Sequence, residues 1–202
     1  MPEPGDSKGQ LLKAAIDLFA ARGFRGTSIR DIANAMDMSI SNIYHYFGSK
    51  EGLLMAILEN SCNMLLERLT QVAHLDIDPL ERFTALLGTH IQLSSRFSRE
   101  AKIFNLDEEH LSPEGVEANR RYQQAILGIY RSELETLRSH GLLNTNNVKV
   151  LAFNILGVIN WKLRWYKPDG PLSEDEVSRE IVDFILRGVL GRRGQGVEET
   201  PA

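Results

Sequence analysis

The chain has 202 residues, of which 43% are hydrophobic and 25% charged, values typical of a globular protein with one or two domains. Its single cysteine, Cys62, excludes an internal disulfide. The longest apolar region, residues 150–163, is interrupted by two asparagines and is too short to cross a bilayer, and the N-terminus has no signal-peptide pattern. We therefore expect a soluble cytoplasmic protein with no membrane partner.

The net charge of −4 is unevenly distributed along the chain. Residues 8–50 hold six Lys or Arg against three Asp or Glu, whereas residues 51–202 hold 17 against 22. The first segment therefore carries a surplus of +3 and the second a surplus of −5. A cationic N-terminal segment is compatible with a nucleic-acid partner, but an asymmetry of this size does not identify one.

Helical periodicity extends through the chain, and no segment alternates like a strand for long. Capping residues mark helix starts at Ser7, Ser28, Ser39, Ser49, Asp78, Ser112 and Ser173. Several of them are followed by a proline or, three positions later, by the second residue of a capping box. The predicted helices cover residues 7–22, 28–36, 39–47, 50–72, 78–97, a short stretch ending near 105, 112–140, 147–166 and 173–188. We predict an all-α protein of about nine helices, with a disordered tail over residues 191–202.

The most informative pattern lies in residues 27–52. A helix that Thr27 or Ser28 can cap, with Asp31 completing a capping box with Ser28, ends at a turn containing Asp37. A second helix runs from Ser39 to Phe47. We expect this second helix to keep Ile40, Ile43 and Phe47 inward. Its outer face then carries Ser39, Ser41, Asn42, Tyr44, His45 and Tyr46. Neutral donors of this kind reach base edges and phosphates without electrostatic repulsion, so the pattern predicts a DNA-reading helix-turn-helix.

The runs Thr-Ser-Ile-Arg-Asp-Ile-Ala (27–33) and Ser-Ile-Ser-Asn-Ile-Tyr-His-Tyr-Phe-Gly-Ser-Lys-Glu-Gly-Leu-Leu (39–54) resemble the DNA-binding domain of the TetR family of bacterial repressors. Residues 14–27 resemble the first helix and loop of that domain. One departure is Asp37, where the family usually has glycine; Asp tolerates left-handed backbone better than most residues, so we expect the turn to be kept.

The resemblance implies a DNA-binding domain over residues 1–50 and a helical ligand-binding and dimerisation domain over residues 51–190. We expect Ser41, Asn42 and Tyr44 to lie nearest the bases of a double-stranded operator. Phosphate contacts are predicted for Thr27, Ser28, Tyr46 and Lys50, and Arg30 is expected to reach a base or a phosphate.

The helices predicted at 147–166 and 173–188 contain more apolar residues than one buried stripe requires. A thick monomer core is one interpretation. The interpretation that we favour, in agreement with the family, is a homodimer in which these helices and their copies form a four-helix bundle.

The central helices combine apolar residues with polar anchors, as small-molecule sites do, and the family resemblance implies an effector pocket here. A second motif, Asn-Trp-Lys-Leu-Arg-Trp-Tyr-Lys-Pro-Asp-Gly-Pro-Leu-Ser (160–173), interleaves cations with aromatics and resembles TetR-like repressors that respond to acyl-CoA thioesters. The predicted effector contacts are Leu93, Arg96, Phe97, Phe104, Arg120, Gln123, Ile126, Tyr130, Leu156, Trp161, Arg164, Trp165 and Lys167. Solvated arginines and core tryptophans are the competing explanation.

The predicted function is a repressor released by an acyl-CoA thioester and controlling degradation of fatty acids, steroids or aromatic acids. A repressor that responds to another hydrophobic compound, in efflux or stress control, is the alternative, and an architectural protein without ligand is a third possibility. An enzyme is disfavoured, because the five histidines show no metal-ligand spacing and no phosphate loop or nucleophile elbow is present. We expect no metal and no cofactor other than the effector.

Overall fold

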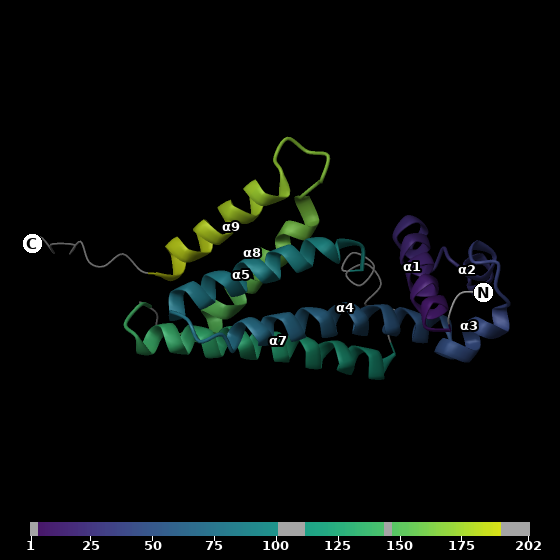
Figure 1. The fold of residues 1–202 in the computed structure, drawn as a ribbon, viewed down its shortest axis with the longest axis horizontal. Coiled ribbons are helices and arrows are strands. Elements are labelled where there is room, and N and C mark those ends of the chain that lie inside the picture. The colour runs from purple at the N-terminus through teal and green to yellow at the C-terminus, as the bar shows by residue number, and fades with distance from the viewer. Residues whose placement is uncertain (1–3, 101–111, 144–146, 191–202) are drawn as a thin grey trace, which may run out of the picture.

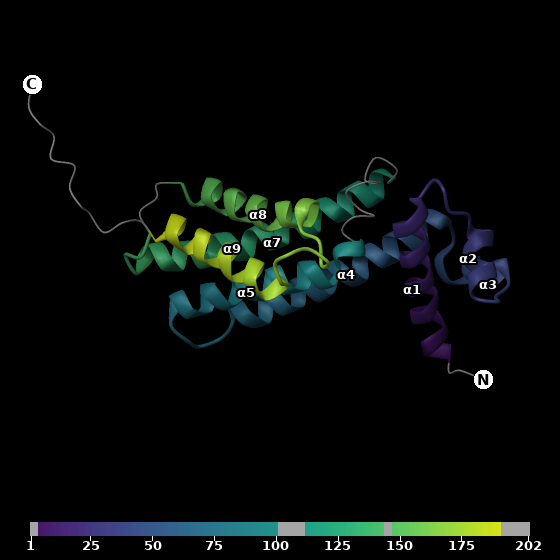
Figure 2. The same ribbon diagram turned by 90° about the horizontal axis from the view of Figure 1, so that it is seen from above.

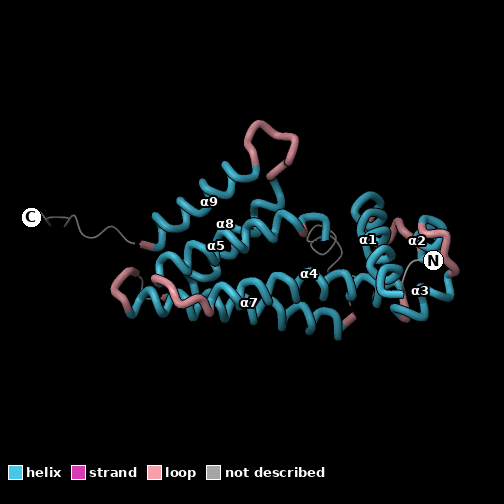
Figure 3. The backbone as a smooth tube through the Cα atoms, viewed as in Figure 1, coloured by secondary structure: helices cyan, strands magenta, loops and turns pink. Residues whose placement is uncertain are grey.

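The computed structural model describes residues 4–100, 112–143 and 147–190, and in these residues it contains eight α-helices and no strand. The helices are α1 (Pro4–Arg22), α2 (Ile29–Ala35), α3 (Ile40–Phe47), α4 (Lys50–Ala73), α5 (Pro79–Arg96), α7 (Pro113–Ser139), α8 (Val148–Trp165) and α9 (Glu174–Val189). The all-α prediction is confirmed (Figure 3). Residues 98–100 are also helical, where the short helix expected to end near residue 105 begins; the rest of that stretch and the predicted tail lie outside the described residues.

The helices form an elongated molecule with a small head and a longer body (Figure 1). Helices α1, α2 and α3 make the head at one end, and α4 runs from the head along the body. In the body α4 packs against α5 and α7, while α9 packs against α5 and α8. Figure 2 shows the same division from above, with α2 and α3 at the far end of the head.

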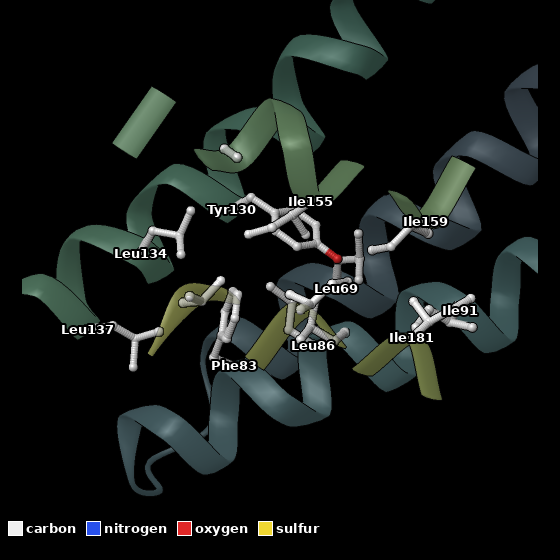
Figure 4. Packing of buried hydrophobic residues seen from close by; sticks show 14 of the residues in the cluster. Leu69, Phe83, Leu86, Ile91, Tyr130, Leu134, Leu137, Ile155, Ile159 and Ile181 are labelled. Carbon is white, nitrogen blue, oxygen red and sulfur yellow. The ribbon is translucent and has the colours of Figure 1, made fainter. Parts of the chain in front are cut away.

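Each part has its own hydrophobic core. The head core contains Leu11, Phe19 and Ile43, and it extends into α4 as far as Leu58. Because the first turns of α4 help to close the head core, the predicted domain boundary between residues 50 and 51 cuts through it. In the body core, Phe83 and Leu86 of α5 face side chains from α7 and α8, among them Tyr130, Leu134, Ile155 and Ile159 (Figure 4).

The predicted helix starts are confirmed at six positions, where the named residue is the N-cap and its side chain accepts a backbone hydrogen bond: Ser28, Ser39, Ser49, Asp78, Ser112 and Ser173. The start predicted at Ser7 is wrong, because α1 begins at Pro4. Proline is favoured in a first helical turn, where the N–H that it lacks would have no partner, so the helix extends three residues further than the capping pattern indicates.

The turn between α2 and α3 keeps its left-handed residue. Asp37 has φ of 50° and is the one non-glycine residue with positive φ in the described part of the chain. The expectation that Asp would replace the usual glycine without loss of the turn is therefore confirmed. Gly141 has φ of 71° directly after α7, the left-handed conformation in which many helices end at a glycine.

Two polar pairs are buried in the body. The His90 Nδ1 atom of α5 lies 2.9 Å from the Tyr130 hydroxyl of α7, and Arg82 Nε of α5 donates to Glu133 Oε2 of α7 over 2.8 Å. Burial raises the pKa of Tyr130 and lowers the pKa of His90 to about 4, so both groups are neutral at pH 7. Among the described helices, none is both long and apolar enough to cross a membrane.

Candidate DNA interface and effector region

The outer face of α3 carries the side chains predicted to read DNA. The helix is capped by Ser39, whose Oγ accepts from the backbone N–H of Asn42 over 3.3 Å, and it is anchored by Ile43, which is buried. All the residues predicted to face outward are exposed: Ser39, Ser41, Asn42, Tyr44, His45 and Tyr46. The helix therefore presents donors and aromatic rings that no other part of the head covers.

Ile40 does not lie where the periodicity placed it. We expected an inward side chain, but 36% of its surface is exposed and it belongs to neither hydrophobic core. The helix starts at this residue, directly after the turn, and the first side chain of α3 that is buried in the head core is Ile43.

The phosphate contact predicted for the Thr27 side chain is wrong in this structure. Its hydroxyl is buried and donates to the backbone carbonyls of Leu18 and Gly23 over 3.2 and 3.0 Å. The side chain therefore closes the loop between α1 and α2. Ser28 and Arg30 remain exposed, and hydrogen bonds from Ser28 lower the pKa of Asp31, its capping-box partner.

Lys50 has partners within the head. Its Nζ donates to the carbonyls of Phe24 and Thr27 over 2.7 and 2.9 Å and lies 4.1 Å from the centre of the Phe24 ring. These contacts attach the start of α4 to the α1–α2 loop, a role that sequence reasoning did not predict. The phosphate contact of Lys50 stays a prediction.

One further feature of the head, the glycine at position 52, was missed in the sequence, and the cations of the predicted surplus were not assigned to individual roles. A Cβ atom on Gly52 would lie 2.0 Å from the carbonyl oxygen of Phe47, so only glycine fits where α4 follows α3. The head also exposes cations for which no role was predicted: Lys8, Lys13, Arg22 and Arg25. Their shared location in the first 25 residues was the available signal.

The predicted effector residues do not form one cluster. Tyr130 is fully buried and bonded to His90. Ile126 and Leu156 are half-buried against the body core, and Leu93 and Phe97 are half-buried at the end of α5. Arg96 and Gln123 are exposed, and Arg120 pairs with Glu117 on the surface of α7 at 2.7 Å, as the solvated-arginine explanation requires. Phe104 lies outside the described residues. In this conformation a ligand has no access to Tyr130.

The aromatic and basic residues of the second motif lie on the surface. Trp161 and Trp165 are 65% and 47% exposed, and Arg164 and Lys167 are exposed as well. An open hollow of about 320 Å³ lies beside them, lined by Trp165, Leu172, Val177, Glu180, Ile181 and Phe184. The two tryptophans share one face, as their spacing predicts, but that face is outward.

Lys162 in the same motif behaves differently, because it is buried. Its Nζ donates to Ser95 Oγ of α5, lies 3.5 Å from Glu174 Oε1 of α9 and stands 5.0 Å from the centre of the Tyr166 ring. Desolvation lowers its pKa, against the opposing effect of Glu174. Lys162 of α8 thus connects its own helix to α5 and α9. The neighbouring residues in the sequence did not predict that it is buried.

Helices α8 and α9 leave large apolar side chains uncovered. The exposed set on these helices is Val150, Phe153, Trp161, Trp165 and Phe184, and we call it the apolar outer face. Phe184 is 66% exposed, whereas its neighbour Ile185 is buried in the core of its own chain. Of these two neighbours, only Phe184 is available for contact with another chain.

Comparison with known proteins identifies the family. Residues 11–57 match "Bacterial regulatory proteins, tetR family", and residues 76–189 match "Tetracyclin repressor-like, C-terminal domain". The chain belongs to the TetR family. It is a TetR-type transcriptional repressor with an N-terminal helix-turn-helix and a C-terminal helical domain, which confirms the resemblance and the interpretation as a regulator rather than an enzyme.

The similar proteins match this chain over nearly its whole length and over nearly all of their own. The HTH-type transcriptional repressor KstR2 of Mycolicibacterium smegmatis is 26% identical over 197 residues, 95% of each chain. A TetR/AcrR-family regulator from Thermobifida fusca is 33% identical with a TM-score of 0.76, covering 91% of this chain and 98% of the other. AibR in complex with isovaleryl coenzyme A and operator DNA is 27% identical with a TM-score of 0.77, covering 91% and 98%.

Proposed function

We propose that this repressor binds a pseudo-palindromic operator as a homodimer in the cytoplasm and is released from it by an acyl-CoA thioester. The genes that it controls would then serve the degradation of fatty acids, steroids or aromatic acids. The observation that carries the DNA-binding part is the exposed, uncharged outer face of α3. The effector part is supported by whole-length similarity to AibR, whose structure contains isovaleryl coenzyme A and operator DNA, and to KstR2.

In the proposed complex α3 enters the major groove. Ser41, Asn42 and Tyr44 reach the base edges, and Ser28, Tyr46 and Arg30 contact the backbone, since each of these side chains is exposed. Ser39 and His45 lie on the same outer face. The exposed cations of the head supply the attraction that does not depend on sequence.

The proposed dimer forms through the apolar outer face of α8 and α9. Isolated exposed apolar side chains are common, but here five large ones occur on two adjacent helices. A two-fold axis beside this face would bring each patch against its copy and would hold the two heads over successive major grooves.

The proposed effector site extends from the half-buried residues of the body to the surface end of α8. The acyl chain would lie among Leu93, Phe97, Ile126 and Leu156, with Phe104 as a further contact. The nucleotide end would meet Trp161, Arg164, Trp165 and Lys167, whose exposure suits the polar part of such a ligand. An acyl chain that also reached Tyr130 would have to separate α5 from α7.

Two contacts connect the body to the head, so a movement in the body would be transmitted through them. Arg99, just after α5, lies 2.5 Å from Asp17 Oδ1 of α1, and the Ser112 backbone N–H at the start of α7 donates to Glu51 in the first turn of α4. A ligand that moves α5 relative to α7 would shift these contacts and tilt α4. Release requires that the ligand bind the DNA-free arrangement more tightly.

Titration of acyl-CoAs of different chain lengths against the operator complex tests the proposal. We expect release by at least one chain length at micromolar concentration, read by fluorescence anisotropy of labelled operator; free CoA and the matching fatty acid are the controls. If no thioester binds or alters DNA affinity while an unrelated hydrophobic compound releases the operator, the alternative effector class is correct.

A further inference from the structure

Ile40 is an aliphatic side chain at the start of the DNA-reading helix that the head leaves partly exposed. It is 36% exposed and contributes to neither hydrophobic cluster. One turn later Ile43 is 1% exposed and is part of the head core. Because Ile43 and the half-buried Phe47 already anchor α3, the packing of the helix does not explain Ile40.

The surroundings of Ile40 are polar and exposed. Ser39 and Ser41 flank it, and Tyr44 lies four residues further along, on the same side of the helix. Among the exposed residues of α3, Ile40 is the sole aliphatic one. It offers no hydrogen bond, so its contribution to a surface of donors and acceptors must come from apolar contact.

The major groove contains one apolar group that such a side chain can recognise. In a helix-turn-helix the N-terminal residues of the second helix meet the base edges, and thymine is the base whose groove edge carries a C5-methyl group. We propose that Ile40 is a specificity-determining residue that contacts a thymine C5-methyl in each half-site of the operator. This inference rests on the proposed function of α3.

The test uses an operator selected from random duplexes by the full-length protein. Each thymine is replaced in turn by uracil, which removes the methyl group and keeps the base-pairing edge and the O4 acceptor. We expect one thymine per half-site whose replacement weakens wild-type binding about fourfold, the effect of exposing one buried methyl-sized group. With Ile40→Ala the same replacement should change affinity by less than about 1.5-fold, because the partner of the methyl is gone.

Two matched variants complete the experiment. Ile40→Val keeps a branched side chain and should retain most of the uracil penalty. Val116→Ala removes an exposed aliphatic of α7 and should leave the full penalty. Because Ile40 is 36% exposed and the rest of it is covered, the melting temperature of Ile40→Ala is measured beside its affinity. A variant that is folded at the assay temperature shows that a change in methyl dependence does not reflect unfolding.

The outcomes separate this inference from the proposed function. An enriched operator with no uracil penalty, or with an equal penalty for wild type and Ile40→Ala, overturns the assignment of Ile40 while sequence-specific DNA binding stands. A selection that enriches no sequence overturns the proposed function and the inference together.

Discussion

The outer face of α3 and the apolar outer face of α8 and α9 are both the uncovered sides of amphipathic helices, yet they differ in chemistry. The first exposes hydroxyls, an amide, an imidazole and phenols around a single isoleucine, whereas the second exposes valine, phenylalanine and tryptophan. Polar donors suit a hydrated, charged partner such as DNA, and large apolar groups suit a surface that excludes water. The side of a helix that the core does not use thus indicates the kind of partner.

The largest effect is expected for a charge on the apolar outer face. Phe184→Glu should convert the dimer to monomers and weaken operator binding by about 100-fold or more, because an unpaired carboxylate would be buried at the interface and one head alone would hold the DNA. Sedimentation and anisotropy measure both effects. Val116→Glu is the control, because it also replaces an exposed apolar side chain with a carboxylate but lies on α7. A wild-type protein that is monomeric at micromolar concentration would contradict the prediction.

The next effect concerns the body core and pH. The pKa of His90 is lowered to about 4 by burial, below its unfolded value near 6.5, so its stabilising contribution is complete above pH 6.5 and is lost as the pH falls toward 4. The loss should approach about 3 kcal/mol of unfolding free energy. Urea unfolding between pH 4 and 7 measures it, with His90→Gln as the reference. Parallel curves for the two proteins would show that His90 does not titrate in this way.

A smaller effect is expected at Lys50, where the variant distinguishes two roles. Lys50→Ala removes hydrogen bonds to two carbonyls and should destabilise the head by about 1–3 kcal/mol. If Lys50 also holds a phosphate, binding to every sequence will weaken and the salt slope will fall by about one unit. Lys13→Ala, which changes an exposed cation on α1, is the comparison. A lower melting temperature with an unchanged salt slope would leave Lys50 with a structural role alone.

The smallest effect on stability is expected at the contact between Arg99 and Asp17. These side chains are 66% and 50% exposed, and exposed ion pairs contribute about 0–1 kcal/mol. Arg99→Ala should therefore leave the melting temperature and operator affinity nearly unchanged, while raising the effector concentration needed for release. An unchanged release curve would show that the coupling does not pass through this contact.

Local hydrogen bonds explain why so much of the fold could be predicted. An N-cap bonds to a group two or three residues away, so the starts at Ser28, Asp78 and Ser173 depend on sequence neighbours alone. The left-handed turn at Asp37 and the exposed polar face of α3 are local in the same sense. For this reason the sequence by itself determined the all-α class, six of the seven marked helix starts and the exposed polar face of α3.

Only the tertiary structure decided which of the predicted binding side chains are exposed and which have partners within the chain. The Thr27 hydroxyl donates to carbonyls of α1 and its loop, and Lys50 donates to carbonyls of the same loop, contacts that the sequence did not indicate. Lys162 is buried by contacts with α5 and α9, although it lies in a motif of exposed cations and aromatics. Ile40 is partly exposed, although the helical periodicity placed it inward. Burial depends on residues that are distant along the chain and meet only after folding, so periodicity identifies the face of a helix but not what covers it.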